Sequence, residues 1–168
     1  MEIRRLRETD WETYRSIRLE ALRLAPEAFG SDVDEQSSLP TEYWAARLAG
    51  GEDSFVLGAF WDGQVVGTAA FSRERRRKVR HKGTITGVYV APAFRGRGVG
   101  GALLTALLGE VRTMQGLEQV TLCVVTENEP ARELYRNLGF EVFGTEPRAL
   151  KVGERYLDEA YMVLLLNQ

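Results

Sequence analysis

The sequence contains few of the residues that build covalent or metal cross-links. Its 168 residues include one cysteine and one histidine. One cysteine cannot form an internal disulfide, and two soft ligands are too few for a structural zinc site. A chain of this length buries about 68–70% of the surface that its unfolded form exposes, so it can form a core without cross-links. We therefore predict a single domain over residues 1–168 that needs no metal.

Long apolar runs are also absent. The longest, Tyr161 to Leu166, is far shorter than the roughly 20 residues that a membrane-spanning helix needs. The chain is charged from Glu2 onward and does not begin with the apolar stretch of a secretory signal. These absences predict a cytoplasmic protein with no membrane partner.

Neither sign of charge dominates, since 22 Lys and Arg residues oppose 24 Asp and Glu residues. This balance argues against a general nucleic-acid binder, which needs a basic face to neutralise phosphates. One segment departs from the average, because only Glu74 opposes the basic residues between Arg73 and Lys82. A solvated loop is the simpler interpretation of that segment, and an anion-attracting rim is the alternative.

Helical and strand-like periodicities alternate along the chain. Thr9 and Glu12 have the spacing of a capping box that would open the first helix, and Pro26 would stop it. Asp62-Gly63 is a strong signal for a short hairpin turn. Together the patterns predict strands at 2–7, 54–60, 64–71, 84–90, 119–125, 140–143 and 155–166, helices at 9–24, 40–49, about 101–116 and 128–138, and a loop at 27–39.

A glycine-rich loop, Arg95-Gly96-Arg97-Gly98-Val99-Gly100-Gly101, lies between a predicted strand and an amphipathic helix. Without side chains, successive backbone N–H groups can approach an anion, and the following helix N-terminus adds partial positive charge. The segment therefore fits a phosphate cradle, although a tight turn with mobile arginines explains the glycines equally well. It lacks the Lys-Ser/Thr pair of a nucleotide triphosphate loop.

The segment from Arg95 to Gly100 resembles the pyrophosphate loop of the GNAT N-acetyltransferase superfamily, Gln/Arg-x-x-Gly-x-Gly/Ala. The segment from Asn128 to Phe140 is similar to the family's Asn-x-x-Ala-x-x-Leu-Tyr-x-x-x-Gly-Phe motif, and Val88 to Pro92 resembles the strand that enters the loop. The predicted order of elements also agrees with this family over nearly the whole chain.

The resemblance implies a mixed α/β (α+β) fold. Its central, largely antiparallel sheet would have about six to seven strands, flanked by about four helices. Strands four and five, here about Thr84 to Val90 and Gln119 to Val125, would splay apart and admit acetyl-coenzyme A (acetyl-CoA) as cosubstrate, without a metal. Unpaired backbone groups of a splayed strand can pair with an amide-rich ligand.

The implied activity is that of an acyltransferase, which moves acetyl from acetyl-CoA to a primary amine by direct attack in a ternary complex. Tyr135 would protonate the leaving thiolate, with a packing role as the alternative. The N–H of Val88 would stabilise the oxyanion. The implied cofactor-binding residues are Val88, Tyr89, Val90, Arg95, Gly96, Arg97, Gly98, Val99, Gly100, Gly101 and Asn128. Helix N-capping is an equal alternative for Asn128.

Several points stay open at the level of sequence. No Asp or Glu lies between Thr84 and Val88, so the general base is unassigned. The alternatives are a water chain to Glu127 or to another acid of the N-terminal loop, or an acceptor of which a small fraction arrives neutral. A cofactor-binding sensor without turnover is therefore the alternative function. A third hypothesis, an RNA-associated acetylase, would use the basic segment 73–82.

The acceptor would be an amine of a small molecule, peptide or protein. By resemblance its choice rests with residues 18–44 and 144–158, whose acidic side chains fit either a cationic amine or a solvated surface. Cys123 is expected to be a buried apolar residue of its strand. A homodimer through the C-terminal strands is compatible with the sequence, which defines no interface.

Overall fold

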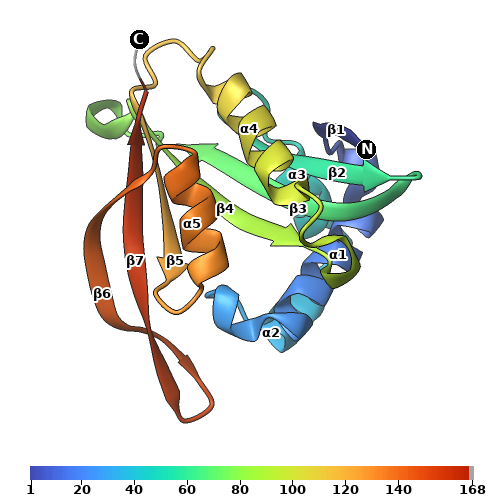
Figure 1. Cartoon of the computed structure of the whole chain (residues 1–168). Helices are drawn as coiled ribbons and strands as arrows, with labels where there is room; N and C mark the ends of the chain where they lie inside the picture. Colours follow the sequence, from blue (N-terminus) through green and yellow to red (C-terminus); the bar gives the residue numbers. More distant parts are fainter. Residues whose placement is uncertain (167–168) are drawn as a thin grey trace.

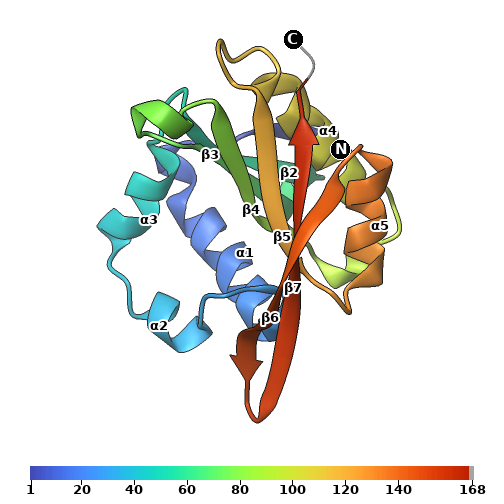
Figure 2. The same cartoon turned by 90° about the vertical axis from the view of Figure 1, so that its left-hand side faces the viewer.

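The computed structural model describes residues 1–166, which contain one seven-stranded sheet in the order β1-β2-β3-β4-β5-β7-β6. Figure 1 shows the sheet with α4 and α5 on one face, and Figure 2 shows α1, α2 and α3 on the other. The strands are β1 (Glu2–Arg5), β2 (Ser54–Trp61), β3 (Gln64–Arg73), β4 (Lys82–Val90), β5 (Gln119–Val125), β6 (Glu141–Val152) and β7 (Arg155–Leu165). The helices are α1 (Trp11–Leu24), α2 (Val33–Ser37), α3 (Thr41–Leu48), α4 (Val99–Val111) and α5 (Glu129–Asn137).

Apolar side chains fill both interfaces between the sheet and its helices. The main core joins the sheet to α4, whose leucine stripe includes the fully buried Leu103, Leu104 and Leu107. A second cluster on the opposite face holds Tyr14 of α1 and Trp44 of α3. The sheet is therefore covered on both faces, as an open sheet with two apolar sides requires.

The central pair of strands separates along its length. All neighbouring strands are antiparallel except β4 and β5, which are parallel and pair only from Lys82 to Thr84 with Gln119 to Thr121. Beyond those residues the two strands diverge, as Figure 1 shows. The predicted mixed sheet with splayed fourth and fifth strands is confirmed.

Two local predictions were wrong. The segment expected to be a loop contains α2, because Asp32 accepts hydrogen bonds from the N–H groups of Asp34 and Glu35 and so caps a short helix. With this short helix, residues 1–166 contain five α-helices. Thr9 does not cap α1, since it lies within a 3₁₀ turn that precedes the helix, Glu8–Asp10. There Asp10 accepts the N–H of Arg7 instead, at 2.7 Å.

Within residues 1–166, no helix combines the length and the apolarity needed to cross a bilayer.

Candidate active site

The facing edges of β4 and β5 carry backbone groups without strand partners where the strands diverge. The N–H of Ala91 donates to Val66 of β3, so the N–H of Val90 points to the other edge, toward β5. A bulge in the β3–β4 pairing contains Gly87, at φ +61°, and Val88, which together lie opposite Ala69. The divergence therefore leaves an edge that a ligand rich in amides could pair with.

The glycine-rich loop presents a run of free donors at the end of β4. Gly96 and Gly98 have φ of +73° and +79°, a conformation that side chains with a Cβ disfavour. Within residues 1–166, no N–H group from Gly96 to Gly101 donates a hydrogen bond. The last of these groups belong to the first turn of α4, where the helix dipole is positive. Such a concave run of N–H groups fits a phosphate or pyrophosphate.

Two other features hold this loop in place. A Cβ on Gly100 would lie 3.3 Å from Cδ2 of Leu134, so the glycine allows α4 to pack closely against α5. Arg95 donates from Nε to the carbonyl of Val90 at 2.9 Å, whereas the guanidinium of Arg97 lies over the rings of Trp61 and Phe94. Arg95 thus occupies a carbonyl that the sequence predicted to be free.

Tyr135 is 6% exposed and lies on α5, with its ring 6.1 Å from the ring of Phe140. Its hydroxyl makes no hydrogen bond to any part of the chain that the structure describes. Burial, and to a smaller extent Cys123 on β5, raises the pKa of Tyr135 to about 12. The phenol is therefore protonated at neutral pH, as a proton donor must be.

The side chains of Tyr89 and Asn128 already have partners. The Tyr89 ring is buried toward α1, and its hydroxyl donates to Oε1 of Glu20 at 2.9 Å, so only the backbone of this residue faces the sheet edges. Asn128 caps α5, accepting the N–H of Ala131 at 3.3 Å. The capping role that the sequence offered for Asn128 is thus present.

Cys123 is exposed, contrary to the expectation of a buried strand residue. It lies on the opposite side of β5 from the main core, because Leu122 and Val124 take up the inward positions. The thiol is close to Glu159 and Glu146, and desolvation together with these carboxylates raises its pKa to about 11. A neutral thiol is therefore the form present at neutral pH.

Glu159 is a residue that the sequence analysis missed, since it lies one position beyond the acceptor segment 144–158. It is half-buried on β7, directly opposite Val125 of β5 and Glu146 of β6. Desolvation, and then repulsion by Glu146, raises the pKa of Glu159, while Cys123 opposes this rise. Alternation along the strand predicts only which residues share a face of the sheet with Glu159. Its place beside the divergence of β4 and β5 follows from the pairing of β7 with both β5 and β6.

Other charged residues singled out in the sequence lie elsewhere. Glu127 is exposed and forms an ion pair with Arg155. The basic segment 73–82 joins the far ends of β3 and β4, at the opposite end of β4 from the glycine-rich loop. There Arg73 donates to the carbonyl oxygens of Arg80 and Gln115. The basic segment therefore lies away from the glycine-rich loop.

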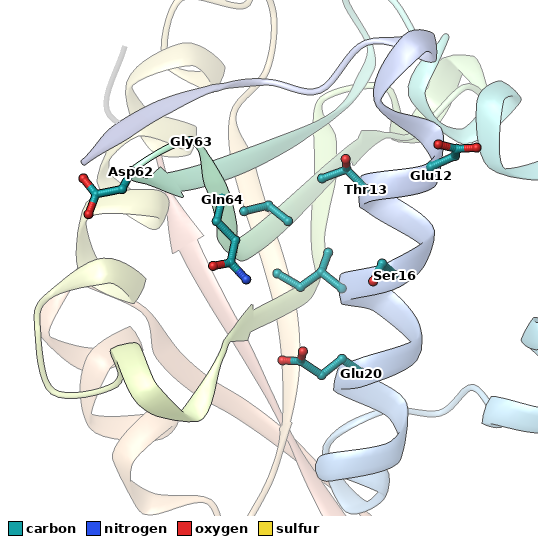
Figure 3. Close-up of a pocket in the computed structure, with 9 residues that line it drawn as sticks. Glu12, Thr13, Ser16, Glu20, Asp62, Gly63 and Gln64 are labelled. Carbon is teal, nitrogen blue, oxygen red and sulfur yellow. The ribbon is translucent and has the colours of Figure 1, made fainter.

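A cavity of about 630 Å³ lies between α1 and the turn that joins β2 to β3 (Figure 3). Its carboxylates are Glu12, Glu20 and Asp62, and Glu20 is engaged by the Tyr89 hydroxyl. None of the residues predicted to bind the cofactor lines this cavity. We therefore place the candidate active site at the divergence of β4 and β5.

Known proteins that are similar to this chain are acetyltransferases. L-amino acid N-acetyltransferase AaaT of Escherichia coli is 30% identical over 162 residues, which are 95% of this chain and 94% of that protein. The L-methionine sulfoximine/L-methionine sulfone acetyltransferase of Pseudomonas paraeruginosa is 35% identical over 62% of this chain and 60% of its own. The solved phosphinothricin acetyltransferase of Sinorhizobium meliloti, in complex with acetyl-CoA, has a TM-score of 0.81 and 25% identity, covering 98% of this chain and 88% of that one.

The family model described as the acetyltransferase (GNAT) family matches residues 4–140, which include both the glycine-rich loop and the segment around Tyr135. The chain therefore belongs to the GNAT family of acetyltransferases.

Proposed function

We propose that the protein transfers the acetyl group of acetyl-CoA to the primary amine of a small molecule of the amino-acid type. The observation that carries this proposal is the run of unpaired N–H groups from Gly96 to Gly101, which adjoins the divergence of β4 and β5. An amino-acid acceptor is supported by AaaT, the L-amino acid N-acetyltransferase that matches this chain along nearly its whole length.

In this proposal the N–H groups from Gly96 to Gly101 bind the pyrophosphate. The edge of β4 pairs with the amides of the pantetheine arm, chiefly through the N–H of Val90, since Arg95 already donates to its carbonyl. Asn128 keeps the N-terminus of α5 in place at the mouth of the divergence.

The transfer itself needs an oxyanion donor and a proton donor. The N–H of Val88 faces the thioester oxygen and stabilises the negative charge that develops when the amine attacks. A C–N bond forms, the C–S bond breaks, and the Tyr135 hydroxyl protonates the departing thiolate. The high pKa of about 12 keeps Tyr135 protonated until a strongly basic thiolate is present.

The acceptor must also lose a proton, and we assign Glu159 to receive it. Its raised pKa makes this carboxylate a stronger base than an exposed glutamate. The main alternative from sequence, Glu127, is paired with Arg155 and exposed. The absence of an acid on β4 thus does not leave the proposed site without a base.

The test is thiol release from acetyl-CoA against L-amino acids, polyamines, aminoglycosides, amino sugars and lysine peptides. We expect turnover of L-amino acids, and Tyr135→Phe should lower kcat on the order of 10²-fold with little change in acetyl-CoA affinity. Tyr14→Phe is the matched control, because Tyr14 is equally buried but packs against Trp44 on the other face of the sheet.

Acetyl-CoA binding without turnover of any amine would favour the sensor function over the proposed enzyme. An unimpaired Tyr135→Phe variant would exclude this tyrosine as the proton donor. Strongly salt-dependent binding to RNA would instead support an RNA-associated acetylase.

A further inference from the structure

Arg18 lies where α1, α2 and β4 meet, and its positively charged guanidinium has no carboxylate partner there. Its Nε donates to Oε1 of Gln36 at 3.1 Å, and one of its terminal nitrogens donates to Oγ of Ser31 at 3.3 Å. The guanidinium carbon lies 4.9 Å from the ring centre of Phe29. All three neighbours are neutral, and no carboxylate within residues 1–166 forms an ion pair with Arg18.

This environment destabilises the charged form of Arg18. Desolvation is the main cause that lowers the pKa of Arg18; Tyr14 and Tyr43 oppose this fall, and the nearby Arg47 adds to it. A guanidinium that is withdrawn from water and lacks an anion is disfavoured relative to one that is paired. An anionic ligand that pairs with Arg18 would therefore gain more binding free energy than one that pairs with an exposed arginine.

The guanidinium is also held in one orientation. Gln36 and Ser31 fix two of its nitrogens, and Phe29 lies against the group. A guanidinium carries five N–H groups, so donors on both terminal nitrogens remain free. Fixed, planar donors of this kind match the two oxygens of a carboxylate.

The free end of Arg18 lies beside the proposed reaction centre. Nη1 is 3.9 Å from the position that a Cβ on Gly87 would take. Gly87 directly precedes Val88, to whose N–H the proposed function assigns the oxyanion, and both lie in β4 beyond its pairing with β5. A carboxylate bound by Arg18 would thus lie next to Val88, the residue that the proposed function assigns to the thioester oxygen.

We propose that Arg18 binds the carboxylate of the acceptor and so selects compact molecules that carry an amine and a carboxylate on the same carbon. This inference rests on the proposed function. In an α-amino acid a single carbon separates the two groups, so a carboxylate on Arg18 brings the amine to the β4 bulge. An acceptor without the carboxylate would leave the guanidinium of Arg18 unpaired. A site rejects a substrate analogue strongly when the analogue leaves a polar group of the site without its partner.

The test compares each of the twenty common L-amino acids with its α-amide, using wild type, Arg18→Gln and Arg18→Lys. For the best amino acid, we expect kcat/KM of Arg18→Gln to fall by 10-fold to 100-fold, mainly through KM, with little change for the matching amide. Arg18→Lys keeps the positive charge but not the planar pair of donors, so its kcat/KM should lie between the values of wild type and Arg18→Gln. Wild type should prefer the acid over its amide by a similar factor.

Arg15→Gln is the matched control. Arg15 lies one helical turn earlier on α1 and likewise donates to the α2 region, through the carbonyl of Ser37 at 3.2 Å. It should keep the preference for the acid, and equal melting temperatures of the variants would show that folding is not the cause of a loss at Arg18. Binding of the N-acetyl amino acid, measured by calorimetry, should weaken in Arg18→Gln and stay unchanged in Arg15→Gln.

The outcomes separate the two proposals. Efficient acetylation of amines that lack a carboxylate, or an equal loss for acid and amide in Arg18→Gln, would overturn the role of Arg18 and leave the proposed function intact. Failure of every amine to react, with acetyl-CoA still bound, would overturn the proposed function and this inference with it.

Discussion

The hydroxyl of Tyr161 donates a hydrogen bond of 2.5 Å to Oε2 of Glu146, across the pair of strands β7 and β6. This bond raises the pKa of Tyr161 to about 12. Tyr161 also lies directly opposite Cys123 of β5, and Glu146 lies opposite Glu159. The four side chains thus lie together beside the divergence of β4 and β5, and the tyrosine hydroxyl donates to Glu146 rather than to Glu159.

The proposed role of Glu159 predicts a specific pH dependence. Its pKa is raised, and a carboxylate accepts a proton only when ionised, so kcat/KM should decline as the pH falls through this raised pKa. Glu159→Gln should lower kcat/KM and remove that acidic limb from the profile. The measurement is kcat/KM between pH 5 and 9, with the acceptor at fixed ionic strength.

Glu127→Gln is the control, because Glu127 is an exposed acid at the end of β5 that is paired with Arg155. The variant should retain the wild-type profile. Loss of the acidic limb in this variant, with the limb kept in Glu159→Gln, would transfer the role of base to Glu127. The groups that surround Glu159 are Glu146, Cys123 and Tyr161, so the profile of Cys123→Ala separates the thiol from the carboxylate.

The positive φ of Gly98 predicts a defect in cofactor binding. Gly98→Ala must hold a residue with a Cβ at φ +79°, which costs roughly 1–2 kcal/mol and shifts the adjoining N–H groups. We expect the Kd for acetyl-CoA to rise by about tenfold or more. Calorimetric titration and thermal melting of the same samples would measure affinity and stability together.

Gly63→Ala provides a matched control for backbone strain. Gly63 has φ +80° in the turn between β2 and β3, and neither glycine has an atom within 4 Å of an added Cβ. Both variants should therefore lose a similar amount of stability, whereas only Gly98→Ala should lose affinity. Unchanged affinity in Gly98→Ala would show that the loop does not bind the pyrophosphate through its present geometry.

The ion pair at the start of α1 predicts an acid-sensitive contribution to stability. Arg4 donates two hydrogen bonds to Asp10, at 2.8 and 3.0 Å, and holds the pKa of that carboxyl below its ordinary value. A depressed pKa in the folded state contributes stability above the unfolded pKa of about 3.9, and the contribution disappears as the pH falls through the folded pKa.

Asp10→Asn should therefore lower the melting temperature at pH 7 by about 2–4 °C, for a loss near 1 kcal/mol, and this deficit should shrink below about pH 4. Glu12→Gln, which changes an exposed acid in the first turn of α1, should show no such trend. A deficit that stays constant down to pH 2 would mean that the Asp10 charge is not its source.

The elements and the family could be predicted from the sequence because both depend on short-range patterns. Apolar residues at helical spacing marked α4, alternation marked the strands, and the glycine-rich loop with the segment around Tyr135 indicated the GNAT family. Such patterns can be read from the sequence because they depend on residues that are close together along the chain. The helix α2 was missed because its stability comes from one capping residue, Asp32, rather than from an apolar stripe.

The surroundings of single side chains depended on the tertiary structure. Cys123 and Glu159 come together through the pairing of β5 with β7, and Arg18 reaches the β4 bulge through the packing of α1 on the sheet. Such neighbours are far apart in sequence, so no local pattern records them. The sequence by itself thus determined which elements form and which family they build, while burial and strand register decided which charges are unpaired and where they point.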